Sequence, residues 1–208
     1  MPVTFHVSPE RLDSGVIRQA AEMLRRGLVV AYPTDTLYGL AVDPRDADAV
    51  KRLYELKGRP DTSALTLIAA DLAQVQAAGE MTPLAHRLAE RWWPGPLTIV
   101  MRARPVVVRE VLAAGQTVGI RIPDHPVAVA LAREAGFCIT ATSANRSGAP
   151  ATSSAESVVD ALPGIDAVLD GGAARGGAPS TIVDVSGAAI ALVREGVLPW
   201  SKVLESLV

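Results

Sequence analysis

The stretch from Ala31 to Leu40, AYPTDTLYGL, constrains the fold more than any other part of the chain. It continues an apolar run, Leu28 to Ala31, that follows a glycine and is typical of a buried strand. Pro33 ends the strand, because proline lacks the N–H that a central strand needs. The polar side chains that follow then lie in a loop at a strand end, where α/β proteins usually bind small molecules. The alternative is a plain turn in which Asp35 and Thr36 bond to their own backbone.

The composition is that of a globular protein that fits one domain, residues 1–208. Apolar residues make up 49% of the chain, yet no apolar stretch approaches the ~20 residues that cross a bilayer. The N-terminus lacks a signal-peptide pattern, and the single cysteine, Cys138, has no partner for an internal disulfide. We therefore expect a cytoplasmic protein without a membrane partner. A net charge of −2 counts against constitutive binding of nucleic acid.

Helix and strand patterns alternate early in the chain, and strand patterns cluster late. Helices are expected over 8–27, 46–58, 71–77, 82–92 and 127–134, and after Pro199. Strands are expected over 28–31, 65–69, 97–101, 117–122, 138–141, 166–170, 181–185 and 190–194, with a polar loop over 142–153. This order predicts an α/β fold with a mixed sheet flanked by helices. Trp92 and Trp93 are expected to anchor the core rather than to stack on bases.

Three sets of polar residues are candidates for ligand contacts. Arg121 lies within a strand, opposite an aliphatic face, where a charge must be paired or line a cavity. A substrate carboxylate is the favoured partner, and a buried ion pair is the alternative. Lys57 and Arg59 flank Gly58 and could hold phosphates, or could offset the dipole at the end of a helix. Hydroxyl and amide groups also cluster at another strand end, at Thr140, Thr142, Ser143 and Asn145, where loop capping is the alternative.

Seven short motifs in a fixed order resemble the Sua5/YrdC/YciO family. They are YPTDTLYGL from Tyr32, KGRP from Lys57, WPGPLTIV from Trp93, GIRIPDHP from Gly119, TSANRSG from Thr142, PSTIVDV from Pro179 and VREG from Val193. The resemblance extends from about Val16 to Gly196 and implies a twisted open α/β sheet with a large concave cavity. The family includes the threonylcarbamoyl-AMP synthases of tRNA modification, which join L-threonine, bicarbonate and ATP.

The resemblance also implies roles for particular residues. It places Lys57 and Arg59 in catalysis and at ATP, together with Ser143, Asn145, Ser153 and Arg194. It places Thr34, Tyr38, Arg121 and Thr181 at the threonine, with Ser180 as a plausible neighbour. We expect Mg²⁺ to arrive with ATP, because the sequence shows no dedicated carboxylate cage. A downstream threonylcarbamoyl transferase and weak tRNA binding are the further partners expected.

Several absences bear on the chemistry. The sequence has no P-loop, its three histidines show no metal spacing, and Cys138 has no evident partner base. The nucleophile would therefore be built from the co-substrates, and the protein would position reactants and neutralise charge.

The chain also departs from the family pattern. Ala64 stands where many relatives have proline, no threonine-contacting histidine occurs between Ser63 and Ala70, and the second domain of longer members is absent. Two alternatives stay open: a module that binds double-stranded RNA or tRNA without chemistry, and a YciO-like paralogue with a different nucleotide-linked ligand.

Overall fold

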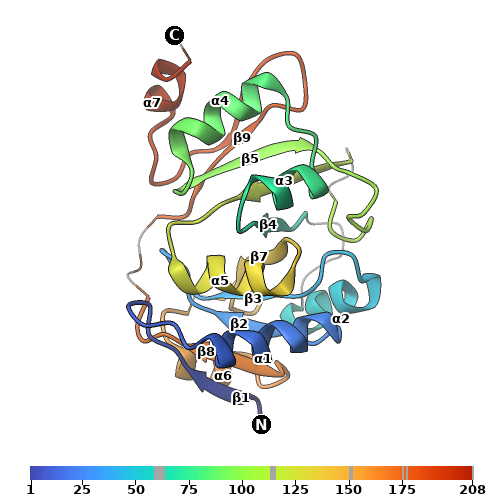
Figure 1. The fold of residues 1–208 in the computed structure, drawn as a ribbon, viewed down its shortest axis with the longest axis vertical. Coiled ribbons are helices and arrows are strands. Elements are labelled where there is room, and N and C mark those ends of the chain that lie inside the picture. Colours follow the sequence, from blue (N-terminus) through green and yellow to red (C-terminus); the bar gives the residue numbers. More distant parts are fainter. Residues whose placement is uncertain (59–63, 113–115, 150–151, 175, 177, 208) are drawn as a thin grey trace.

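Ten strands of the described chain form one mixed sheet in the computed structural model of the protein (Figure 1). The description covers residues 1–58, 64–112, 116–149, 152–174, 176 and 178–207. The strands are β1 (Val3–His6), β2 (Val30–Tyr32), β3 (Gly39–Ala41), β4 (Thr66–Ile68), β5 (Leu97–Arg102), β6 (Thr117–Arg121), β7 (Ile139–Ser143), β8 (Ala167–Asp170), β9 (Thr181–Asp184) and β10 (Ala191–Arg194). Their order across the sheet is β1-β8-β2-β3-β7-β4-β6-β5-β9-β10. The predicted α/β class with a mixed sheet is confirmed.

Parallel and antiparallel pairs are interspersed along this sheet. Strand β8 runs parallel to both β1 and β2, and the pairs β4–β6 and β5–β9 are also parallel. The centre is antiparallel, because β7 pairs in that sense with both β3 and β4. Strands distant in sequence therefore meet at the middle of the sheet. That the whole chain, 1–208, is a single domain stays a prediction.

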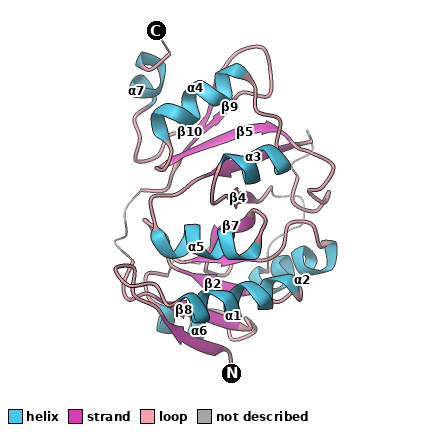
Figure 2. Cartoon of the chain, in the orientation of Figure 1, coloured by secondary structure: helices cyan, strands magenta, loops and turns pink. Residues whose placement is uncertain are grey.

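Helices cover both faces of the sheet (Figure 2). They are α1 (Ser14–Arg25), α2 (Ala47–Lys57), α3 (Leu72–Ala78), α4 (Pro83–Trp92), α5 (Pro126–Ala135), α6 (Ala155–Ala161) and α7 (Trp200–Glu205). Buried side chains form two clusters: α1 and α5 contribute to one, and α2, α4 and α6 to the other. Neighbouring strand residues alternate between them, with Val30 in the first and Ala31 in the second. Within the described chain, no helix combines the length and the apolar character needed to cross a membrane.

The helix boundaries follow from side chains that cap the free N–H groups of the first turn. Asp46 caps α2 as predicted, and Asp71 and Thr82 cap α3 and α4. The predicted start of the first helix at Ser8 is wrong, because the Asp13 carboxylate accepts from the N–H groups of Gly15 and Val16 and starts the helix there. Gly58, at φ 57°, ends α2 in the left-handed conformation that glycine favours.

Three elements were missing from the sequence prediction: β1, β3 and α6. Each has only three to seven residues, and its pattern is too short to stand out in sequence. Strand β7 also continues to Ser143, which the sequence placed in the polar loop, because Gly39 and Leu40 of β3 pair with its last residues. This extension brings Thr142 and Ser143 onto the sheet.

The two tryptophans anchor the core, as predicted. The indole N–H of Trp93 donates to the carbonyl of Leu97 at 2.7 Å, and that of Trp92 donates to Ser206 Oγ at 3.1 Å. Both rings also pack against the larger hydrophobic cluster. Their N–H groups are therefore used within the fold, as buried indoles require.

Candidate functional site

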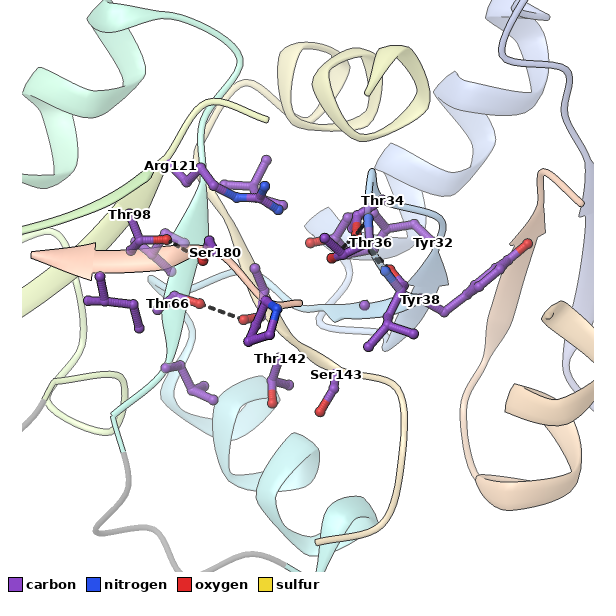
Figure 3. Close-up of a pocket in the computed structure, with 18 of the residues that line it drawn as sticks. Tyr32, Thr34, Thr36, Tyr38, Thr66, Thr98, Arg121, Thr142, Ser143 and Ser180 are labelled. Atoms are coloured by element: carbon purple, nitrogen blue, oxygen red, sulfur yellow. Dashed lines mark hydrogen bonds between the residues drawn. The ribbon is translucent and has the colours of Figure 1, made fainter. Parts of the chain in front are cut away.

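A cavity of about 480 Å³ opens across the middle of the sheet (Figure 3). Its walls come from the β2–β3 loop, from β4 to β7, from the segment before β9 and from β10. Two arginines, Arg121 and Arg194, face it. Hydroxyl groups line it at Thr34, Thr36, Thr66, Thr98, Ser143 and Ser180. Its volume is in the range of small-molecule sites, and its polar groups converge from several strands.

The loop after β2 is a turn held by one hydroxyl group. Thr34 Oγ1 accepts from the N–H groups of Thr36 (3.2 Å) and Leu37 (3.3 Å) and donates to the Leu37 carbonyl at 2.6 Å. The turn that the sequence offered as the alternative is thus present, and the hydrogen bonds of the Thr34 hydroxyl hold it. In that alternative Asp35 bonds to its own backbone, whereas in the structure its carboxylate bonds to Arg121 on another strand.

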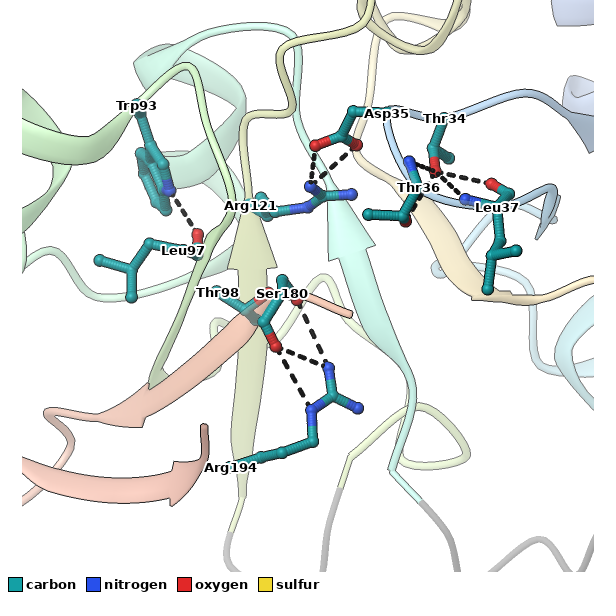
Figure 4. A network of polar contacts seen from close by, with 10 residues as sticks. All are labelled: Thr34, Asp35, Thr36, Leu37, Trp93, Leu97, Thr98, Arg121, Ser180 and Arg194. Carbon is teal, nitrogen blue, oxygen red and sulfur yellow. Dashed lines mark hydrogen bonds and ion pairs between the residues drawn. The ribbon is translucent and has the colours of Figure 1, made fainter. Parts of the chain in front are cut away.

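Asp35 forms an ion pair with Arg121 (Figure 4). Its two carboxylate oxygens lie 2.8 and 3.0 Å from the same nitrogen, Arg121 Nη1. The side chains are 19% and 10% exposed, so the contact is largely shielded from water. The prediction that Arg121 lies opposite the aliphatic face is confirmed, since Val118 and Ile120 belong to the core. Of its two expected partners the ion pair is present, and the substrate carboxylate stays a prediction.

Arg194 supplies the second positive charge of the cavity. Its Nη2 donates to the Ser180 carbonyl at 2.9 Å, and Ser180 Oγ lies 2.9 Å from Thr98 Oγ1. Burial lowers the pKa of the Arg194 guanidinium below its ordinary value, and the positive charge of Arg121 lowers it further. The field of Arg121 therefore reaches Arg194, and a bound anion would relieve the repulsion between them.

Thr181 acts behind the wall of the cavity rather than on its surface. Its buried hydroxyl accepts from the Gly196 N–H at 2.9 Å and donates to the Leu198 carbonyl. A Cβ on Gly196 would lie 2.1 Å from the Pro179 carbonyl oxygen, so only glycine fits there. These contacts hold the chain after β10 against the segment before β9 and thereby place Arg194. That Thr181 contacts the amino acid stays a prediction, and in this structure its hydroxyl bonds to the backbone.

Lys57 is buried at the end of α2, away from the lining of the cavity. Its ammonium donates to the carbonyls of Ser143 and, at 2.8 Å, Asn145, and the N–H of Ser147 donates to the Lys57 carbonyl at 2.8 Å. Lys57 therefore ties α2 to the loop after β7. Its predicted contact with ATP is not tested by these bonds, and Arg59 lies outside the described residues.

Asn145 and Ser143 share the loop that Lys57 holds. The Asn145 amide donates to the carbonyls of Arg146 (3.0 Å) and Ala149 (2.6 Å). Its Oδ1 is buried and has no partner among the described residues. Ser143 faces the cavity, whereas Asn145 lies behind it. A buried acceptor without a donor is costly, so this oxygen is the group in the loop most ready to accept a hydrogen bond.

Two further predicted contacts lie at the margin of the site. The Tyr38 hydroxyl donates to the Gly172 carbonyl at 2.7 Å and accepts from the Gly171 N–H at 3.1 Å, so it points away from the cavity (Figure 3). Burial raises the pKa of Tyr38 to about 12, which keeps the hydroxyl protonated. Ser153 is exposed and lies outside the lining, and its carbonyl accepts from the Ala174 N–H at 2.7 Å. Their ligand contacts stay predictions.

Sequence reasoning missed Thr66, Thr98 and the pairing of Asp35. Thr66 and Thr98 interrupt aliphatic strands, and a hydroxyl in such a strand signals a face that meets a cavity. Gly119 lies between them, because a Cβ there would be 3.2 Å from Thr66 Cγ2 and 3.1 Å from Thr98 Cγ2. The alternation of threonine and glycine on neighbouring strands could therefore have located the floor of the site. Nothing in the sequence pairs Asp35 with Arg121.

The described residues offer neither a metal centre nor an activated thiol. No group of three His, Cys, Asp or Glu side chains among them could hold a metal ion. Asp35, which reaches into this region, is already paired with Arg121, so these residues do not form a cage for Mg²⁺. Burial raises the pKa of the Cys138 thiol to about 12, and its Sγ donates to the Gln74 carbonyl. Cys138 is thus a buried residue immediately before β7, whereas the sequence placed it as the first residue of that strand.

Comparisons with known proteins agree with this architecture. The sequence profile of the Sua5_yciO_yrdC family, described as "Telomere recombination", matches residues 22–196. A protein of Bacillus subtilis named threonylcarbamoyl-AMP synthase is 43% identical over 86% of this chain. The crystal structure of Pyrococcus abyssi Sua5 complexed with L-threonine superposes with a TM-score of 0.93 at 37% identity and covers 99% of this chain. The crystal structure of Escherichia coli YciO superposes with a TM-score of 0.85 at 30% identity and covers 96%.

The lengths of these proteins differ. The matched region makes up 53% of the Bacillus subtilis protein and 61% of the Pyrococcus abyssi Sua5 chain. It makes up 98% of the YciO chain. The chain therefore spans little more than half the length of these two proteins and nearly all of YciO.

Proposed function

The chain belongs to the Sua5/YciO/YrdC family, and we propose that it makes threonylcarbamoyl-AMP from L-threonine, bicarbonate and ATP. The observation that carries the proposal is the cavity, in which two arginines and a series of hydroxyl groups converge. An amino acid presents a carboxylate, and ATP presents phosphates, so both substrates are anions that such a cavity suits. The names of the relatives and the threonine bound to Pyrococcus abyssi Sua5 support the same reaction.

The reaction needs no nucleophile from the protein. The amine of threonine adds to CO₂ derived from bicarbonate, forms a C–N bond and loses a proton, which gives a carbamate. A carbamate oxygen then attacks the α-phosphorus of ATP, the new O–P bond forms, and pyrophosphate leaves with the electrons of the broken P–O bond. The protein has to hold the reactants together and offset the negative charge. Cys138, the most nucleophilic type of side chain here, is buried and protonated, which agrees with this division of labour.

Arg121 and Arg194 divide the cavity between the two substrates. Arg121 would bind the α-carboxylate of threonine, with Thr34 close by on the loop opposite. Arg194 would face the nucleotide together with Ser143. This assignment of one arginine to each substrate is supported by their positions. Arg121 lies on β6 and Arg194 on β10, and β5 and β9 lie between these strands in the sheet.

Lys57 and Asn145 would serve the nucleotide from behind the lining. Lys57 holds the backbone of Ser143 and Asn145, and the unpartnered Asn145 Oδ1 lies in the same loop. A shift of this loop on binding would bring the Lys57 charge and the Asn145 N–H groups to the phosphates, whereas Asn145 Oδ1 suits an N–H or O–H donor of the nucleoside. Arg59 follows in the sequence and keeps its predicted role in catalysis. Mg²⁺ bound to ATP would neutralise phosphate charge.

The proposal places the protein among the nucleotidyltransferases. Its product is a mixed anhydride that a threonylcarbamoyl transferase would consume during the modification of tRNA. We expect that work to be done in the cytoplasm. RNA binding by the protein itself is expected to be weak, and adenylate formation should not require tRNA.

Pyrophosphate release tests the proposed reaction. ATP, threonine and bicarbonate are supplied together and then with each omitted in turn. We expect pyrophosphate only from the complete mixture. Release without threonine would instead indicate hydrolysis of ATP, and no release from the complete mixture would reject the proposal.

A YciO-like ligand is the second candidate function. The observation that favours it is the superposition on YciO, with a TM-score of 0.85 over 98% of the YciO chain. Length does not separate the candidates, because the chain also covers 92% of a Vibrio vulnificus protein named threonylcarbamoyl-AMP synthase. Thermal-shift measurements with ATP alone and with threonine alone separate the two. Stabilisation by both agrees with the synthase, whereas stabilisation by a nucleotide without any response to threonine favours the YciO-like ligand.

A further inference from the structure

The contact between Asp35 and Arg121 uses only part of the guanidinium group. Both oxygens of Asp35 lie against Nη1, at 2.8 and 3.0 Å. No described residue accepts a hydrogen bond from Nε or Nη2 of Arg121, although the side chain is only 10% exposed. In Figure 4 the rest of the guanidinium extends from Asp35 towards the Thr36 side of the cavity. The Nε–Nη2 edge carries two parallel N–H groups, the arrangement that binds a carboxylate through two hydrogen bonds.

The loop that carries Asp35 is built to reach Arg121. Asp35 follows β2, whereas Arg121 ends β6, and β3, β7 and β4 lie between these strands in the sheet. The hydroxyl of Thr34 closes the turn on both sides of Asp35 and fixes its direction. The ion pair therefore joins the β2–β3 loop to the end of β6, beside the cavity. An arginine side chain held in this way loses its rotamer freedom before a ligand arrives.

Charge balance gives Asp35 a second effect on the same arginine. Arg121 and Arg194 both face the cavity, and the pKa of Arg194 is lowered partly by Arg121. Asp35 offsets one of these two charges at a distance of 2.8 Å. Asp35 thereby stabilises the buried Arg121 guanidinium and leaves its Nε–Nη2 edge available.

We infer that Asp35 is the positioning residue of the amino-acid subsite. It holds Arg121 through Nη1 and so presents the Nε–Nη2 edge to the α-carboxylate of the substrate. The inference rests on the proposed function, since the carboxylate is that of the amino acid. Asp35 itself touches neither the substrate carboxylate nor the reacting atoms in this arrangement.

Direct titration of threonine tests this role without turnover. Calorimetry compares the wild-type protein with Asp35→Ala, Asp35→Asn and Asp35→Glu. We expect Asp35→Ala to weaken threonine binding about tenfold to a hundredfold and to change ATP binding less than about threefold, because a charge-assisted contact supports only the first ligand. Asp35→Asn keeps one acceptor and should fall between. Arg52→Ala, which removes the ion pair with Asp166 outside the cavity, is the matched control and should leave both affinities unchanged.

Formate adds a readout that a merely structural role would not move. In the Asp35→Ala protein a formate ion can take the place of the missing carboxylate against Nη1, so added formate should strengthen threonine binding. In the wild-type protein that place is filled, and formate should only compete with threonine for the free edge. In an Arg121→Ala background, Asp35→Ala should cause no further loss, since it acts through the arginine.

Each outcome decides one of the two claims. If the wild-type protein does not bind threonine, the proposed function fails and the inference fails with it. If the wild-type protein binds threonine and Asp35→Ala binds it equally well, only the positioning role is overturned. Equal losses of threonine and ATP affinity in Asp35→Ala without rescue by formate would also overturn it, in favour of a general effect on folding.

Discussion

Arg121 and Lys57 are both buried cations, with 8% and 3% of their surfaces exposed, yet the fold uses them in different ways. Arg121 pairs with one carboxylate and lies on the wall of the cavity. Lys57 donates to two backbone carbonyls and lies behind that wall. One cation meets the ligand space directly, whereas the other supports the loop that does.

The difference follows from the shapes of the two groups. A guanidinium spreads five N–H donors over three nitrogens, so one nitrogen can bind the protein while another edge stays available. An ammonium presents its donors from a single point, so its bonds to carbonyls fix the position of the whole charge. A buried arginine can therefore bond to the protein through one nitrogen and to a ligand through another. A buried lysine that donates to backbone carbonyls keeps its whole charge at those carbonyls.

The largest effect is expected from Lys57→Ala, which removes the cation that supports the loop after β7. The change removes the ammonium donor from the carbonyls of Ser143 and Asn145. The Ser143 carbonyl keeps the N–H of Asn145 at 2.9 Å, whereas an unsatisfied buried Asn145 carbonyl costs about 1–3 kcal/mol. We expect the free energy of unfolding in urea to fall by about 2 kcal/mol or more, and pyrophosphate release to fall at least about a hundredfold. Full stability in this variant would mean that the Asn145 carbonyl is satisfied by water instead. Lys51→Ala, on the exposed side of α2, is the control.

Arg121→Lys separates charge from shape at the other cation. The variant keeps the positive charge but loses the planar edge, so the KM for threonine should rise about tenfold or more. The KM for ATP should change little, because Arg194 and the loop of Ser143 lie elsewhere on the wall. Steady-state kinetics with each substrate varied in turn measures the two constants. Equal increases in both would remove the distinction between the subsites.

Arg194→Ala should have a smaller effect, because this side chain is only partly buried and its guanidinium donates to the Ser180 carbonyl at 2.9 Å. We expect the KM for ATP to rise about tenfold at most and the unfolding free energy to change by less than about 0.5 kcal/mol. Nucleotide titration and urea unfolding check the two values. A stability loss as large as that of Lys57→Ala would show that Arg194 supports the fold, as Lys57 does, rather than binding the nucleotide.

Cys138 provides the baseline, a buried ionisable group without a ligand role. Its pKa is about 12 in the fold against an ordinary 9.0, so the unfolded chain loses the proton first. The stability that this thiol contributes is full below about pH 9 and is lost as the pH rises towards 12, with a slope of at most about 1.4 kcal/mol per pH unit.

Cys138→Ala should therefore flatten the decline of stability in that alkaline range and leave activity at pH 7 within about twofold. Urea unfolding at a series of pH values measures the first effect, and pyrophosphate release measures the second. Complete loss of activity in folded Cys138→Ser protein would restore a covalent role and end the use of Cys138 as a baseline.

Local patterns in the sequence determined much of the fold. The cap of α2 at Asp46 and its end at Gly58 are set by neighbouring residues, and so is the alternation that puts Ile120 in the core and Arg121 opposite it. Short motifs also determined the family. Short elements escaped prediction: β3 has three residues and becomes a strand only because β2 and β7 lie on either side of it.

Only the tertiary structure decided how the candidate residues are used. Asp35 and Arg121 are 86 positions apart, as are Lys57 and Ser143. Thr181, at the start of β9, accepts a hydrogen bond from Gly196, which follows β10. Sequence patterns report which residue types are present and which face of a strand or helix they occupy. Which donor meets which acceptor depends on the order of strands in the sheet, because a hydrogen bond extends only about 3 Å.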